Sequence, residues 1–491
     1  MGRPPARGRS ALPLAGRPAD HDPRGRLTAD LVVRGGTIVT PAGSFRADLA
    51  VEGGRISAIE PDLSSLAASA REVVDAAGLL VLPGIVDVHT HTRVASDAEP
   101  DRFFQDSVAA AFGGTTTFLA FNNPGTGSSP AAERSLVAGL SEWRAATSSD
   151  AAVDYAVSLA ISGRMDDPVG ELATIVDSGV PTAKAFMVFD FRLDNERLFE
   201  AIRTMGARGG RLEVHCEDPA LIDASVAAEL ARGNTAPRFH ASSRPALAEA
   251  IATARTMAFA EAADAPVHVV HLSSLGALEA VRAAKARGVR ASAETCPHYL
   301  ALTDERYLDP DDAEVAKVVI SPPLRSATDR DALWTGLADG SLDLVATDHV
   351  PDRVAVEKRV AGVPFNQMSN GAPGIETLLA IAWSEGVATG RLTAEGLVEL
   401  LSAAPARLFG LGSKGVLERG RDADLVLFDP LAERTIRATD LHHTSDYTAF
   451  EGLAVRGAVR SVFVRGRAVI RDGLFVGQRG DGHFVERRLN D

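Results

Sequence analysis

Cysteine is scarce in this chain of 491 residues, which contains only Cys216 and Cys296. A secreted protein of this length that depended on disulfides would usually contain more, so we expect a reducing, cytoplasmic compartment. The sequence also lacks an uninterrupted apolar run of the length that a membrane helix requires. With 45% hydrophobic residues and 24% charged residues, it predicts a globular protein that does not span a membrane.

Basic residues are outnumbered, because 51 Lys and Arg stand against 65 Asp and Glu, for a net charge of −14. Phosphate binding requires clustered Lys and Arg, so this balance argues against nucleic acid as the main partner. Residues 1–27 are rich in Pro, Gly, Ala and Arg and lack the apolar core of a secretory signal. Their prolines also oppose an amphipathic import helix, and we predict a disordered tail over 1–27.

Both ends of the chain carry short strand-like segments. Ala29–Val39 and Asp48–Ile59 are apolar runs broken by Gly-Gly pairs, a pattern typical of hairpins. Near the other end, Ala423–Phe428 and Val459–Arg465 again favour strands. We therefore predict one small β domain assembled from both termini, with residues 28–83 and 411–491 as its two parts.

The middle of the chain, residues 84–410, alternates apolar strand-like runs with Ala- and Leu-rich helical stretches. The predicted strands are Ile85–Val88, Thr115–Phe121, Asp154–Ala160, Thr182–Val188, Arg211–His215, Pro266–Leu272, Val289–Glu294 and Leu342–Thr347. Eight such units predict a (β/α)₈ barrel of the TIM type. A further apolar stretch, Val315–Ile320, makes the strand count ambiguous by one.

Polar side chains with metal-binding chemistry follow these strands. They are His89 and His91 after the first strand, Lys184 on the fourth, His215 after the fifth, His271 on the sixth and Asp348 after the eighth. The carboxyl ends of the strands are where such barrels place their chemistry. Each residue alone would more often be structural, but their joint position predicts one site. Burial lowers the pKa of a lysine, and a neutral Lys184 amine can react with carbon dioxide to form a carbamate. Imidazoles, a bridging carbamate and a carboxylate suit two divalent ions, zinc or a similar metal.

Several further motifs give the sequence a family resemblance, which covers nearly everything from Ala29 to the C-terminus. It is similar to the cyclic amidohydrolases of the amidohydrolase superfamily, namely hydantoinase/dihydropyrimidinase, allantoinase and dihydroorotase. The motifs are LPGIVDVHTH (82–91), AAAFGGTTT (109–117), ETCPHYLALT (294–303), SPPLR (321–325), NGAPGIET (370–377) and GRDADLVLFDP (420–430). The resemblance implies a binuclear metal barrel with carboxylated Lys184, a terminal β-sandwich, and a homo-oligomer, either tetramer or dimer.

The resemblance also implies a reaction and its residues. A metal-bridging hydroxide would hydrolyse a C–N bond in a hydantoin, dihydropyrimidine or similar ureide or imide ring, a small-molecule substrate. Asp348 would act as general base and then as general acid. The backbone around Ser321 and Asn370 would bind the imide edge of the ring; without the resemblance both would be ordinary loop residues.

Two departures leave the substrate open. Hydantoinases and dihydropyrimidinases usually have a tyrosine five residues after the carboxylated lysine, where this chain has Phe189. Arg93 and Asn123 resemble the arginine and asparagine that hold the substrate carboxylate in dihydroorotases, although Arg93 in a structural ion pair is an equal alternative. Allantoinase and dihydroorotase activity therefore stay open beside the main hypothesis. A non-catalytic dihydropyrimidinase-related scaffold is disfavoured, because every ligand position is intact.

Overall fold

Eight parallel strands form the central sheet of the computed structural model, which describes residues 29–122, 131, 133–359 and 362–489. Their order in the sheet follows the chain: β8 (Ile85–Thr90), β9 (Thr115–Asn122), β10 (Asp154–Ala160), β11 (Thr182–Phe186), β12 (Arg211–His215), β13 (Val267–Val269), β14 (Ala291–Thr295) and β15 (Leu344–Val345). A parallel bridge between Thr90 and His349 brings the first strand beside the end of the last. The predicted (β/α)₈ barrel is confirmed.

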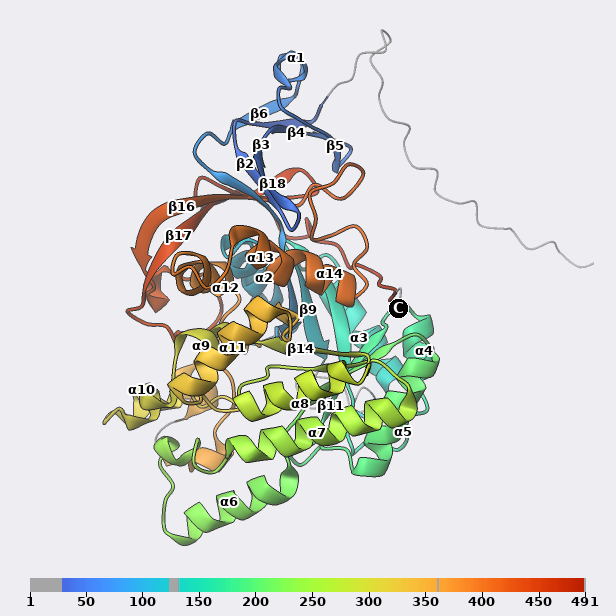
Figure 1. Cartoon of the computed structure of the whole chain (residues 1–491), viewed down its shortest axis with the longest axis vertical. Helices are drawn as coiled ribbons and strands as arrows, with labels where there is room; N and C mark the ends of the chain where they lie inside the picture. The colour runs from blue at the N-terminus through green and yellow to red at the C-terminus, as the bar shows by residue number, and fades with distance from the viewer. Residues whose placement is uncertain (1–28, 123–130, 132, 360–361, 490–491) are drawn as a thin grey trace, which may run out of the picture.

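The barrel strands are buried on both faces, because side chains fill the interior and helices cover the outside. These covering helices lie around the strands in Figure 1. They are α2 (Arg102–Phe112), α3 (Leu136–Thr147), α4 (Leu172–Asp177), α5 (Asn195–Ala207), α6 (Pro219–Ala231), α7 (Ala246–Ala263), α8 (Leu275–Ala286), α11 (Ala327–Asp339), α12 (Leu378–Ile381), α13 (Ala394–Val398) and α14 (Ala404–Leu408). Short helices α9 (Pro297–Ala301) and α10 (Asp312–Ala316) follow β14.

Two further sheets, blue and red in Figure 1, are built from the ends of the described chain. The four-stranded sheet has the order β5 (Arg55–Glu60), β4 (Asp48–Glu52), β1 (Leu31–Arg34) and β6 (Glu72–Asp75), with α1 (Ser64–Ala67) beside it. The seven-stranded sheet has the order β19 (Leu474–Phe475), β18 (Arg467–Arg471), β17 (Ala454–Val464), β16 (Leu425–Thr435), β7 (Leu80–Pro83), β2 (Thr37–Thr40) and β3 (Gly43–Arg46). The antiparallel pairing of β16 with β7 joins the two ends.

The structure corrects two local predictions. Gly53-Gly54 does form a hairpin turn, between β4 and β5, but Gly35-Gly36 does not, because β1 and β2 belong to different sheets. A side chain at Gly36 would meet Val81 at 2.6 Å, so glycine lets the chain cross closely over β7. The apolar stretch Val315–Ile320 is not a ninth strand: its first two residues end α10 and the rest is irregular.

The predicted limits of the two β parts, 28–83 and 411–491, stay predictions. Within the second range, the chain also returns to the barrel. Phe484 forms a parallel bridge with Tyr155 on β10. The guanidinium of the buried Arg487 donates to the carbonyls of Val157 and Phe409, at 2.6 and 3.2 Å. The C-terminal segment therefore packs against the barrel as well as the terminal sheets.

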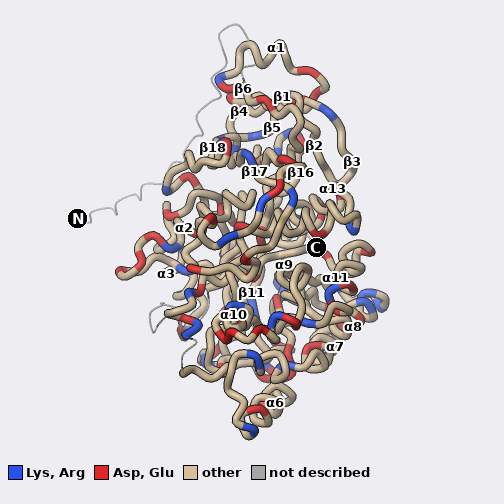
Figure 2. The backbone as a smooth tube through the Cα atoms, turned by 90° about the vertical axis from the view of Figure 1, so that its left-hand side faces the viewer, with Lys and Arg blue, Asp and Glu red and all other residues tan. Residues whose placement is uncertain are grey.

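The charged residues of the described chain are interspersed, as acidic and basic positions alternate along the tube in Figure 2. Among the described residues, no helix has the length and apolar character that crossing a membrane requires.

A buried cation joins the terminal sheets to the barrel. The Lys414 Nζ lies 2.6 Å from Asp154 on β10, 2.9 Å from Asp424 and 3.0 Å from Asp422. Burial by itself would lower the pKa of Lys414, but these three carboxylates raise it above its ordinary value. The ammonium therefore stays protonated and compensates the buried negative charge of Asp154 and Asp424.

We expect Lys414→Met to lower the free energy of unfolding by about 3–5 kcal/mol, because it leaves buried carboxylates without their counter-charge. Urea denaturation followed by circular dichroism measures this. Lys285→Met is the control, since Lys285 pairs with Asp343 at 2.7 Å but is partly exposed, and it should cost below about 1 kcal/mol. Equal losses in the two variants would contradict the role of Lys414.

Candidate metal centre

Three predicted ligands meet where the first and last barrel strands adjoin. His89 Nε2 and His91 Nε2 lie 3.0 and 3.2 Å from Asp348 Oδ1. The donor atoms of these three residues all lie within 4.8 Å of one another, a grouping that could hold a metal ion. His89 is fully buried on β8, whereas His91 and Asp348 keep slight exposure and line the cavity described below.

The other three predicted ligands lie beside them. Lys184 on β11 is fully buried, and its Nζ is 2.9 Å from His89 Nε2. His215 Nδ1 and His271 Nε2 face each other at 3.0 Å. His271 was predicted within the sixth strand, but β13 ends at Val269 and His271 follows it. The structure thus brings all six predicted ligands together.

Burial and neighbouring charges together set the charge state of the donors. Burial would lower the pKa of His89, but Glu294 and Asp348 raise it to about 9. At Lys184, His91 and His271 the effect of burial prevails. It lowers the pKa of Lys184 below the ordinary lysine value, which favours the neutral amine that carbamate formation requires. It also lowers the pKa of His91 to about 4 and that of His271 well below its ordinary value, so both imidazoles are neutral at pH 7. Burial would raise the pKa of Asp348, but His89 and His91 hold it well below the ordinary value. Neutral imidazoles and an ionised carboxylate are the forms that bind metal.

Two carboxylates that the sequence analysis did not assign orient the histidines. Glu294 on β14 binds His89 Nδ1, His268 Nε2 at 3.0 Å and the backbone N–H of His271 at 3.2 Å. Glu217 lies 2.8 Å from His215 Nε2 and pairs with Arg244. Such partners fix the tautomer and ring orientation of a ligating histidine. Glu294 lies in the motif ETCPHYLALT. A carboxylate at the end of a predicted buried strand is the sequence feature that could have identified it.

The backbone at the site is strained where it turns away from the strands. The φ angles of His271, Asp348 and Phe189 are 38°, 49° and 74°, in the left-handed region that non-glycine residues rarely adopt. Strain of this kind concentrates at functional sites, where the surrounding structure enforces it.

A cavity of about 450 Å³ is lined by five of the six residues, all except His89, and by Ser321 and Asn370. Ser321 Oγ donates a hydrogen bond to Asn370 Oδ1 at 2.7 Å, and Asn370 Nδ2 donates to the carbonyl of Met368 at 3.1 Å. The Ser321 hydroxyl proton and the Asn370 side-chain oxygen are thus paired with each other at the cavity. The structure therefore places both residues at the cavity.

The cavity has an aromatic wall, formed by Phe121, Phe186, Phe189, Phe191 and Trp143. Phe189 stacks on Phe191 with ring centroids 5.5 Å apart. The ring of Phe189 also lies 5.1 Å from the Arg244 guanidinium carbon. This part of the cavity is suited to an apolar group.

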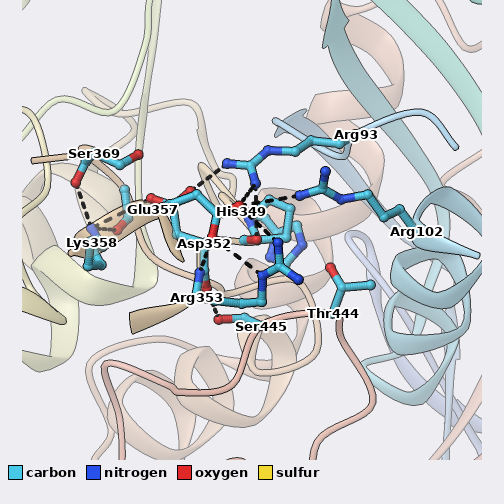
Figure 3. A network of polar contacts seen from close by, with 12 residues as sticks. Arg93, Arg102, His349, Asp352, Arg353, Glu357, Lys358, Ser369, Thr444 and Ser445 are labelled. Carbon is cyan, nitrogen blue, oxygen red and sulfur yellow. Dashed lines mark hydrogen bonds and ion pairs between the residues drawn. The ribbon is translucent and has the colours of Figure 1, made fainter. Parts of the chain in front are cut away.

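Arg93 lines the cavity, but two carboxylates bind its guanidinium (Figure 3). Its Nη2 donates to Asp352 Oδ1 at 2.5 Å and its Nη1 to Glu357 Oε1 at 2.9 Å. These ion pairs favour the structural alternative for Arg93 over a contact with a substrate carboxylate. Asn123, its predicted companion, lies outside the described residues.

His89, His91 and Asp348 offer a donor set that could hold a metal ion. Beside it, Lys184 Nζ lies 2.9 Å from His89 Nε2, and His215 Nδ1 lies 3.0 Å from His271 Nε2. His271 Nδ1 is buried without a hydrogen-bond partner among the described residues. Buried, converging nitrogen and oxygen donors are typical of protein metal sites.

The chain is similar to known proteins over most of its length. Residues 80–469 match the model of the amidohydrolase family. D-hydantoinase of Ralstonia pickettii is 38% identical over 464 residues, which are 94% of this chain and 99% of that protein. D-phenylhydantoinase of Escherichia coli is 37% identical over 421 residues, 85% of this chain and 90% of that protein. The crystal structure of dihydropyrimidinase from Brevibacillus agri superposes with a TM-score of 0.87 at 37% identity, covering 93% of this chain and 98% of that one. The chain belongs to the amidohydrolase family.

Proposed function

We propose that this protein hydrolyses the C–N bond of a cyclic amide, the ring of a hydantoin, a dihydropyrimidine or a similar ureide. The observation that carries the proposal is the cavity. Five of the six candidate metal ligands line one part of it, with His89 buried beside Lys184 and Asp348, and the Ser321–Asn370 pair lines another. Relatives named D-hydantoinase and dihydropyrimidinase, alike over nearly the whole length of this chain, support the same chemistry. The intact donor set disfavours the scaffold alternative.

Two divalent ions, zinc in our proposal, would be held by these residues. His89, His91 and Asp348 would hold one ion, and His215 and His271 the other, with carboxylated Lys184 shared by both. When bound, such ions lower the pKa of water to about 7 and polarise a carbonyl oxygen. Glu294 and Glu217 would keep the imidazole rings of His89 and His215 aimed at the ions.

Asp348 would move the proton. Its Oδ1 lies against His89 and His91, which leaves Oδ2 to accept a proton from the attacking water. The same oxygen then returns the proton to the ring nitrogen as the C–N bond breaks and the carbonyl carbon becomes a carboxylate. The low pKa of Asp348 keeps the carboxylate ionised before the reaction begins.

The walls of the cavity would select the substrate. We propose that the backbone around Ser321 and Asn370 binds the imide edge of the ring, because the Ser321 hydroxyl proton is already donated to Asn370 and both residues line the cavity. The aromatic wall with Phe189 and Phe191 would receive an apolar substituent on the ring. Phe189 has no hydroxyl, so in this protein the carbonyl oxygen would receive no hydrogen bond at that position.

We also propose a homo-oligomer, tetramer or dimer, located in the cytoplasm. Leu431 on β16 and Leu474 on β19 are each 69% exposed, and such apolar side chains on the C-terminal sheet are available for contact with another copy. Cys216 and Cys296 are both free and buried, which agrees with a reducing compartment.

A substrate screen tests the proposed function. We expect the zinc-loaded protein to open hydantoin, a 5-aryl hydantoin or dihydrouracil, followed as loss of ring absorbance and appearance of the carbamoyl acid. Asp348→Asn should lower kcat by about 10³-fold or more, because it removes the proton carrier and weakens a ligand. Turnover of allantoin or dihydroorotate alone would instead favour those alternatives, and turnover by Asp348→Asn within a few-fold of the parent would remove its acid–base role.

Lys184→Ala should abolish turnover and reduce the bound metal from the proposed two ions per chain to fewer than one. The reason is that two cations at short range repel each other unless an anion bridges them. Elemental analysis of the purified variant measures the metal, and circular dichroism verifies the fold. Added short carboxylic acids should partly restore turnover. Unchanged metal content with full turnover would contradict the carbamate.

Arg93→Met should lower kcat/KM by about tenfold on neutral and acidic rings alike, because it removes the partner of two carboxylates rather than a substrate contact. The measurement compares a 5-aryl hydantoin with a hydantoin that bears a carboxylate. Arg353→Met is the control, since Arg353 pairs with Glu357 at 3.3 Å but does not line the cavity. A fall in kcat/KM for the carboxylated hydantoin alone would instead show that Arg93 binds the substrate carboxylate.

A further inference from the structure

Lys358 is a fully buried cation for which the proposed reaction has no use. It ends the short π-helical turn Val354–Lys358, which follows the segment after Asp348. Its Nζ donates hydrogen bonds to three backbone carbonyls: those of Val319 at 3.0 Å, Gly371 at 2.6 Å and Ser369 at 2.9 Å. Figure 3 shows the bond to Ser369. An ammonium has three N–H donors, and here all three are used.

The three carbonyls belong to the two segments that carry the proposed ring contacts. Val319 lies two residues before Ser321, and Ser369 and Gly371 flank Asn370. The two segments are also joined directly, since the N–H of Gly371 donates to the carbonyl of Val319 at 3.0 Å. Tyr447 adds a hydrogen bond from its hydroxyl to the carbonyl of Gly371 at 3.2 Å. Lys358 therefore ties together the backbone on both sides of the Ser321–Asn370 pair.

The charge of Lys358 is balanced through Asp352, which is buried as well. Asp352 Oδ2 lies 3.8 Å from Lys358 Nζ, and its Oδ1 accepts a hydrogen bond from Arg93. Burial lowers the pKa of Lys358 to about 8; Asp352 and Glu357 raise it, and Arg93 lowers it further. At neutral pH the ammonium is protonated and keeps its three donors. A continuous set of contacts thus runs from Arg93, two residues after His91, to the carbonyls beside Asn370.

This arrangement differs from that of the other buried lysine at a junction, Lys414. Lys414 faces three carboxylates, whereas Lys358 is hydrogen-bonded to neutral carbonyls and has one carboxylate at 3.8 Å. A buried ammonium with so little counter-charge carries a large desolvation cost, and an apolar side chain of similar volume would avoid it. What an apolar side chain cannot do is fix three carbonyls in one geometry.

We propose that Lys358 is a positioning residue that sets the backbone of residues 319–321 and 369–371 for recognition of the substrate's imide edge. The inference rests on the proposed function for what that backbone binds. Lys358 takes the carbonyls of Val319, Ser369 and Gly371 and makes no hydrogen bond to those of Ser321 and Asn370. Asp352 lies between Lys358 and Arg93, and Arg93 lies two residues after the candidate ligand His91. These contacts would fix the position of the ring-binding backbone relative to the metal ligands.

Lys358→Met tests the proposal through the separation of KM from kcat. We expect KM to rise about tenfold or more for hydantoin and for a 5-aryl hydantoin alike, because the ring edge is common to both. We expect kcat to stay within about threefold and the metal content to stay unchanged, since no ligand is touched. Lys358→Gln keeps two N–H donors without the charge, and should give an intermediate KM. If Lys358→Met does not fold, the same measurements on Lys358→Gln test the proposal.

Lys317→Met is the matched control, because Lys317 lies two residues from Val319 but its Nζ binds Glu314 at 2.5 Å at the protein surface. Its KM should equal that of the parent. An unchanged KM in Lys358→Met would overturn the proposal. So would a fall in kcat and metal content at constant KM, which would assign Lys358 to the metal centre or to the general fold.

Hydrogen exchange separates this proposal from the proposed function. In Lys358→Met, amides in peptides covering 316–324 and 366–373 should exchange faster than in the parent and in Lys317→Met, with the barrel strands unchanged. Unchanged exchange in these peptides would overturn the positioning role whatever the substrate. If the parent protein opened none of the rings, the proposed function would fail, and the exchange result would still decide whether Lys358 holds these segments.

Discussion

Asp87 on β8 accepts hydrogen bonds from the backbone N–H of Thr347 at 3.1 Å and from its hydroxyl at 2.5 Å, and so joins the first barrel strand to the last. The N–H of His91 then donates to the carbonyl of His349 at 2.7 Å. These bonds bring two histidines and an aspartate, separated by more than 250 residues of sequence, to one point. Because every donor is buried, the junction excludes water and holds one register. The rest of the site is arranged around it.

The buried carboxylates Glu294 and Glu217 orient the imidazole rings of His89 and His215. Each accepts hydrogen bonds from a histidine of the site and from further donors, which are His268 and the backbone N–H of His271 for Glu294 and Arg244 for Glu217. Burial alone would raise the pKa of Glu217, but Arg244 and His215 hold it at about 2, so it stays an acceptor. Acceptors that stay ionised keep the opposite ring nitrogen free for a metal.

The loop after Asp348 gives this member of the family its own character. Arg93 would have been the natural ligand for an acidic substrate, but Asp352 and Glu357 bind it and turn it into part of the wall. Opposite, Phe189 stands where the resemblance leads one to expect a phenol, and it stacks on Phe191. Both features shift the cavity toward apolar substituents. The same loop carries Lys358, which donates hydrogen bonds to the carbonyls of Ser369 and Gly371 on either side of Asn370.

The sequence by itself determined the barrel, its eight strands and the six polar residues that meet at their ends. Buried strands are recognisable from local sequence. Because all strands of a parallel barrel end on the same side, residues that follow them in the sequence are expected to lie close together. It also indicated that both termini build β-sheets, as β16 and β7 do. Only the tertiary structure decided the rest. Gly35-Gly36 looks like Gly53-Gly54 in sequence, yet the first is a crossing between sheets and the second a hairpin turn, because close packing against Val81 is a non-local fact. Arg93 meets Glu357 264 residues away, Glu294 meets His89 205 residues away, and Lys358 meets the carbonyl of Val319 on a separate segment. Which partner each one meets follows from loop packing that no periodicity encodes.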